Sequence, residues 1–117
     1  MILSQTKSIE LEQEKDLQGV KIMTLALELW VHETGTTKID LAEQSGIWKV
    51  YMNKDGYERT QTFDKYLSIK KFPTFPRWSK VYMTVDFVLL SCPGASDRKN
   101  ALEIEYTHLR NLALVFG

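Results

Sequence analysis

The stretch YMNKDGYERTQT carries amide and carboxylate side chains at spacings typical of a calcium loop. Asn53, Asp55 and Gly56 match positions three, five and six of an EF-hand loop. Position one would then be Tyr51 and position twelve Thr62, so two carboxylates that the cation needs are absent. Cys92 is the only cysteine, which excludes a multi-cysteine zinc site. We therefore expect neither a metal nor a cofactor.

The two histidines lack the partners that acid–base catalysis needs. His32 lies near Glu28 and Glu33, and His108 lies near Glu105, but no nucleophilic serine or cysteine completes a triad in the sequence. The glycines are scattered, so no phosphate loop is present. We expect that the protein is not an enzyme.

Positive charge is concentrated in the middle of a chain whose net charge is zero. Residues 47–80 hold eight basic and three acidic side chains, a net charge of +5, whereas residues 1–46 hold four and eight, a net charge of −4. Such a block is either a solvated basic face or a surface that meets an anionic partner.

The elements that would position these residues are mainly helical, in one domain spanning 1–117. A long helix is expected over 8–34, with Ser8 as N-cap, and C-terminal helices over 76–117, with Ser96 as the cap of the last one. The stretch WSKVYMTVDFVLLSC fits both a helical stripe and a strand alternation, and we favour the helix because no partner strand is evident. A short helix starting at a Thr62 cap precedes it.

The segment 37–54 has the spacing of a helix-turn-helix. Ala42 is small enough for a second helix to cross, Gly46 tolerates a left-handed turn, and Ile47 and Met52 follow as core residues. Thr37 can cap the first helix.

In this setting LAEQSGI resembles the helix-turn-helix of phage and bacterial repressors and activators, such as the lambda repressor and CII-like group, over residues 37–67 at most. The resemblance implies a recognition helix over 47–54 that enters the DNA major groove. The side chains it would present to bases are Trp48, Lys49, Val50, Asn53 and Lys54, with Tyr57 just beyond. The implied contacts to the DNA backbone are Thr37, Lys38, Arg59, Thr60, Lys65, Lys70 and Lys71.

Two other arrangements of this segment stay open. Asp55 stands where the family usually has a core hydrophobe, so the helix could be rotated, with Lys49, Met52 and Asn53 as the base readers. Alternatively, IWKVYM and YERTQTF flank NKDG as a β-hairpin, a wing within 47–63 that presents Lys54 and Arg59 to phosphates.

Together these patterns predict an all-α (mainly helical) domain that acts as a sequence-specific DNA-binding transcription regulator. Two units are needed for two half-sites, so we expect a homodimer formed through the long N-terminal helix, the C-terminal helix, or both. The alternative is a non-enzymatic interaction module whose basic middle docks an acidic protein. No secretory signal or membrane span is evident, so we expect a cytoplasmic, nucleoid-associated protein in a prokaryotic or viral context and a nuclear one in a eukaryote.

Overall fold

A computed structural model describes the backbone of residues 2–116 and the side chains of residue 10 and residues 12–114. Within this part of the chain five helices and one hairpin follow in the order α1 (Ile2–Thr34), α2 (Lys38–Ser45), β1 (Tyr51–Met52), β2 (Glu58–Arg59), α3 (Gln61–Lys65), α4 (Trp78–Ser91) and α5 (Asp97–Phe116). The predicted mainly helical fold is confirmed, and the hairpin lies inside the range predicted for a wing.

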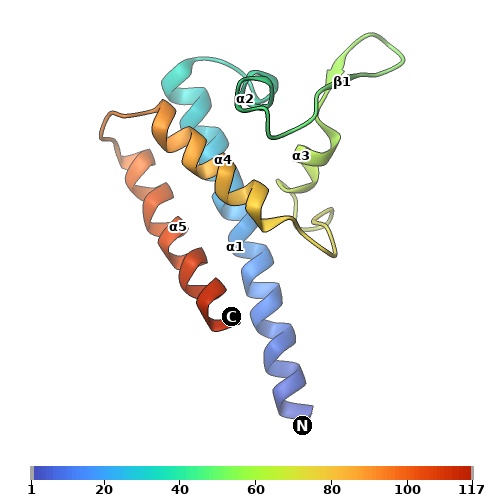
Figure 1. Cartoon of the computed structure of the whole chain (residues 1–117), viewed down its shortest axis with the longest axis vertical. Helices are drawn as coiled ribbons and strands as arrows, with labels where there is room; N and C mark the ends of the chain where they lie inside the picture. The colour runs from blue at the N-terminus through green and yellow to red at the C-terminus, as the bar shows by residue number, and fades with distance from the viewer. Residues whose placement is uncertain (1, 117) are drawn as a thin grey trace.

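Helix α1 is the axis of the fold, and α4 and α5 pack against it (Figure 1). α5 runs antiparallel to α1 (Figure 1). Two polar contacts join these helices at Glu105: Gln18 Nε2 donates to its backbone oxygen at 3.1 Å, and Lys21 pairs with its carboxylate at 3.0 Å. The helix predicted over 8–34 is thus part of a longer helix that starts at Ile2. None of the helices between residues 2 and 116 combines the length and the apolar composition needed to cross a bilayer.

One core joins all five helices and the segment before the hairpin. Residues at helical spacings of three and four supply it, as expected for amphipathic helices. Its buried apolar members are Ile22, Met23, Ala26, Leu29, Trp30, Leu41, Ala42, Trp48, Phe63, Tyr66, Val81, Val85, Val88, Cys92, Leu102, Tyr106 and Leu109.

Helix α2 has the two ends that its sequence predicts. The Thr37 hydroxyl accepts from the Asp40 N–H at 3.2 Å, and the Asp40 carboxylate accepts from the Thr37 N–H at 3.4 Å, which is a capping box. Gly46 ends the helix at φ +69° and donates its N–H to the Ala42 oxygen at 3.1 Å. Ala42 is fully buried, so the first half of the helix-turn-helix pattern has its expected local structure.

The recognition helix predicted over 47–54 is wrong. Residues 46–50 form an irregular segment, and Tyr51 and Met52 form β1, which pairs with β2 in an antiparallel register that places Tyr51 opposite Arg59. The cause is Trp48, which is 3% exposed and packs with ring centroids 5.0 Å from both Phe63 and Tyr66. Burying this ring draws the chain inward after Gly46, and the hairpin alternative is therefore the correct one.

The later elements agree with their sequence signals, with one shift at α3. Thr60, not Thr62, precedes α3, and its hydroxyl donates to the Asp64 carboxylate at 3.0 Å. Trp78–Ser91 is a helix, as favoured over the strand. At α5, the Ser96 hydroxyl accepts from the Lys99 N–H at 3.1 Å, which is the predicted cap.

Candidate nucleic-acid interface

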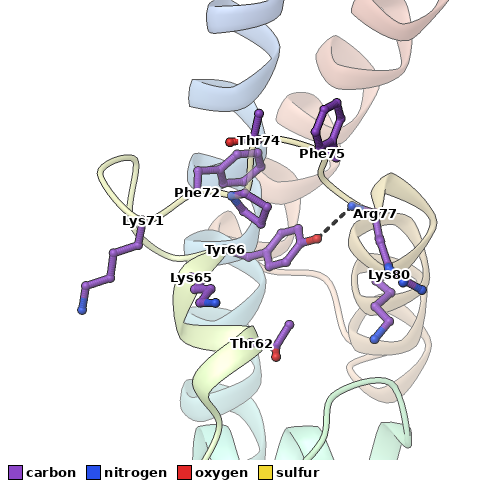
Figure 2. A pocket seen from close by; sticks show the side chains of 10 residues that line it. Thr62, Lys65, Tyr66, Lys71, Phe72, Thr74, Phe75, Arg77 and Lys80 are labelled. Atoms are coloured by element: carbon purple, nitrogen blue, oxygen red, sulfur yellow. Dashed lines mark hydrogen bonds between the residues drawn. The ribbon is translucent and has the colours of Figure 1, made fainter.

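An open cleft lies between α3, the 66–77 loop and the start of α4. Its volume is about 660 Å³. The residues that line it are Thr62, Lys65, Tyr66, Lys71, Phe72, Pro73, Thr74, Phe75, Arg77 and Lys80. Four of these are cations and none is a carboxylate, and Figure 2 shows Lys71 on one side of the cleft with Arg77 and Lys80 on the other. The cleft is therefore suited to an anion.

Aromatic rings in edge-to-face and tilted contact hold the walls of this cleft in place. Tyr66 lies 5.3 Å from Phe72, and Phe72 lies 5.8 Å from Trp78, measured between ring centroids. The Tyr66 hydroxyl accepts from the Arg77 N–H at 2.8 Å, the bond drawn in Figure 2. These contacts tie the end of α3 to the start of α4 across the two prolines of the loop, so the cations are carried by a packed scaffold.

The N-terminus of α4 opens beside the cleft without a side-chain cap. Arg77 occupies the N-cap position, and no side chain there bonds to the first N–H groups of the helix. Uncapped N–H groups and the positive end of the helix dipole attract anions. Arg77 and Lys80 add formal charge at the same place, and in the described residues neither forms an ion pair with a carboxylate. A phosphate is the kind of group that such a helix end binds.

The hairpin is a second, separate set of exposed groups. The Asn53 side-chain oxygen accepts from the N–H groups of Asp55 and Tyr57 at 3.0 and 2.9 Å, and Gly56 takes φ +82°, so the turn is fixed by its own residues. Lys54, Tyr57 and Arg59 are exposed, with the Arg59 guanidinium 5.5 Å from the Tyr57 ring centre. The hairpin projects from the body of the molecule (Figure 1).

Ten of the thirteen residues that the sequence assigned to DNA contact fall into three groups in the structure. Lys65 and Lys71 line the cleft, and Lys70 is exposed on the same loop. The exposed residues of this set on or near the hairpin are Lys49, Lys54, Tyr57 and Arg59. The Asn53 side chain instead accepts a hydrogen bond within the turn. Thr37 caps α2, and Lys38 pairs with the carboxylate of Asp64.

Two of the assigned residues, Trp48 and Thr60, are buried, which corrects the prediction for them, and Val50 is partly buried. Trp48 is 3% exposed and donates its Nε1–H to the Thr84 hydroxyl at 2.9 Å. Thr60 is 1% exposed, and Val50 is half-buried against the core. The side chains of Trp48 and Thr60 are used for packing, so they cannot reach a base or a phosphate without unfolding of the segment that holds them.

Sequence reasoning missed Arg77, Lys80, Thr62 and Thr74 as cleft residues. The signal was available in part, because both cations belong to the basic block 47–80 and Arg77 follows a proline just before a helix, where anions bind. No local pattern could predict that the start of α4 lies close to the end of α3. That approach depends on the ring contacts of Tyr66, Phe72 and Trp78.

Fold and cleft together define a small helical domain with a projecting hairpin and a cationic surface for a polyanion. No family model matches the chain, and no curated protein matches it. Among solved structures it is similar to the DNA-binding domain from the sensor histidine kinase ChiS from Vibrio cholerae, with 33% sequence identity and a TM-score of 0.86. The similarity covers 90% of this chain and 97% of that one. The chain belongs to the same family as that domain.

Proposed function

We propose that this chain binds double-stranded DNA and regulates transcription by recognising a specific sequence. The observation that carries the proposal is its similarity, over nearly its whole length, to a domain whose description is DNA-binding. The cleft supports it because its lining includes Lys65, Lys71, Arg77 and Lys80 and no carboxylate. Phosphate contacts of this kind supply affinity and register, whereas base contacts supply sequence preference.

Two surfaces can contact the duplex together. The cleft would hold phosphates of one strand, and the hairpin would place Lys54 and Arg59 against the neighbouring backbone or the groove edge. In Figure 1 the hairpin and α3 lie on the same side of the molecule, away from α5. This arrangement supports a proposed interface on the hairpin, α3 and the α4 N-terminus, instead of the recognition helix that the sequence suggested.

The test is a salt titration of binding to a labelled random duplex, followed by fluorescence anisotropy. If the four cleft cations and the two hairpin cations each neutralise one phosphate, log K should fall with log salt at a slope of about −5. Between 50 and 200 mM salt the affinity should then drop by about 10³-fold.

The variants Lys71→Gln and Arg77→Gln should each make the slope shallower by about 0.9. The matched control is Arg98→Gln, because Arg98 is exposed at the start of α5 and lies outside the cleft and the hairpin. Absence of binding at low salt would reject the DNA proposal and favour an acidic protein as the partner of the basic surface. An unchanged slope in the cleft variants, with normal wild-type binding, would reject only the placement of the interface.

We also propose that the protein acts as a homodimer. One unit of this size reads a short half-site, and two units about one DNA turn apart give the specificity that regulation needs. Exposed apolar side chains on α1 and α5, among them Leu17, Ile104 and Leu114, support this assignment of the dimer surface to the terminal helices. Light scattering after gel filtration gives the mass directly, and a monomer at high concentration, both free and on DNA, would reject the dimer.

A further inference from the structure

Phe75 is the most exposed of the large hydrophobic side chains that the structure describes, at 90%. Phe75 belongs to the loop sequence Phe72-Pro73-Thr74-Phe75-Pro76 and lines the basic cleft. In Figure 2 it lies at the opposite end of the cleft from Thr62. The contrast with Phe72 is informative, because Phe72 is half-buried and its ring makes an edge-to-face contact with Tyr66 and a tilted contact with Trp78. One phenylalanine anchors the loop, and the other faces outward.

The backbone that carries Phe75 is held on both sides. Pro73 and Pro76 fix their own φ angles and restrict the residues before them, which include Phe75. On the far side, Arg77 donates its N–H to the Tyr66 hydroxyl at 2.8 Å. A side chain on such a loop loses little conformational entropy when it meets a partner, and this favours a binding role over a merely exposed loop residue.

Charge differs on the two sides of Phe75. On one side is the cleft with its four cations. On the other is a smaller cavity of about 490 Å³, which Phe75 and Trp78 share with Glu12, Lys15 and Asp16 of α1. A phosphate strand is attracted to the first side, whereas the two carboxylates of α1 oppose it on the second. Phe75 therefore lies at the boundary where a bound strand would leave the cations and the groove would begin.

We propose that Phe75 is an apolar base contact: with phosphates seated among Lys71, Arg77 and Lys80, its ring enters the groove and packs against base edges or a base step. The inference rests on the proposed function and adds to it a residue that contributes to sequence preference. A phenyl ring can recognise the methyl group of thymine in the major groove or can wedge between bases in the minor groove. The contact in both cases is apolar and base-dependent, unlike that of the cations around it.

The experiment starts by selecting a preferred duplex from a random pool with the wild-type chain. Affinity is then measured on that duplex and on random duplex for Phe75→Ala. Base–aromatic packing is worth about 1–3 kcal/mol, so we expect an affinity loss of about 5- to 150-fold on the selected duplex. Affinity for random duplex and the salt slope should stay unchanged, because no charge is removed.

Two controls separate the contact from general effects. Leu90→Ala removes a side chain that is 83% exposed on α4 and is not among the residues lining the cleft, and it should change neither affinity. Lys71→Gln should weaken both duplexes and make the salt slope shallower. The urea midpoint and the oligomeric state of Phe75→Ala are measured as well. Both should equal those of the wild type because the side chain is exposed.

Replacing thymine by deoxyuracil in the selected duplex tells the two forms of the contact apart. If the methyl group is the partner, the replacement should cost the wild type as much as Phe75→Ala does and should cost the variant nothing. If the ring wedges into a step, 2-aminopurine at that step should brighten with wild-type protein only.

Equal loss on both duplexes, no loss on either, or dissociation of a dimer in the variant would each overturn the role of Phe75 while leaving DNA binding intact. Failure of the wild type to bind any duplex would overturn both proposals.

Discussion

Gly19 allows α1 to approach the base of the cleft. A methyl group at this position would lie 2.8 and 2.9 Å from two carbon atoms of the Trp78 ring and 3.3 Å from the Phe72 ring. Helix propensity alone would make Gly19→Ala stabilising by about 1 kcal/mol. Overpacking against the two rings costs about 1–3 kcal/mol. Subtracting the gain in helix propensity, we expect Gly19→Ala to lower the free energy of unfolding by about 0–2 kcal/mol.

The substitution should also change DNA binding, because Trp78 is the first residue of α4 and Arg77 precedes it. Displacing the ring shifts Arg77 and Lys80 relative to Lys65, and loss of one phosphate contact would make the salt slope shallower by about 0.9.

Urea unfolding and the salt titration are the two assays for Gly19→Ala. The control is Gly94→Ala, since nothing lies within 4 Å of a methyl group there and its φ is not positive. It should leave DNA binding unchanged and stability unchanged or higher by up to about 1 kcal/mol. A Gly19→Ala protein that is stabilised by about 1 kcal/mol and keeps its full salt slope would refute the steric reasoning.

Four further substitutions test the fold by urea unfolding. Trp48→Phe removes the hydrogen bond to Thr84 and part of a buried ring, so it should cost about 1–3 kcal/mol, whereas Thr84→Ser, which keeps the hydroxyl, should cost less. Gly46→Ala should cost about 1–2 kcal/mol through φ +69° alone, because no atom lies within 4 Å, and a cost near zero would contradict this. Hydrogen bonds from Gln18 and Lys21 lower the pKa of Glu105. The ionised carboxylate therefore stabilises the fold above its usual pKa, and this stabilisation is lost as the pH falls through the lowered pKa. Glu105→Gln should accordingly be less stable than the wild type at pH 7, and the difference in the free energy of unfolding should vanish below about pH 4.

The mainly helical fold, both ends of α2 and the start of α5 could be predicted because their causes are local, whereas the predicted starts of α1 and α3 were displaced. Thr37 and Asp40 are three residues apart, Gly46 follows the last turn of α2, and Ser96 precedes α5. A cap of this kind needs only neighbours in the sequence. The local pattern of Trp78–Ser91 fits both a helix and a strand, and the helix is favoured because no partner strand is evident.

The segment after Gly46 could not be predicted, because its structure depends on distant partners. Trp48 is held by Phe63 of α3, by Tyr66 just after it and by Thr84 of α4, and none of these lies within ten residues of it. Only the packing shows that the large ring of Trp48 belongs to the core, so that residues 46–50 are irregular and the hairpin strand starts at Tyr51.

The ring contacts of Trp48, which the predicted recognition helix did not account for, also explain how the cleft can work as an interface. Trp48, Phe63, Tyr66, Phe72 and Trp78 form one continuous series of ring contacts that links the hairpin segment to α3 and α4. Packing of this kind is insensitive to salt, whereas the contacts made by the surrounding cations are strongly sensitive to it. The scaffold can therefore keep Lys65, Lys71 and Arg77 in place over the range of ionic strength in which phosphate contacts are gained and lost, and a change of affinity with salt should report the contacts themselves and not the opening of the fold.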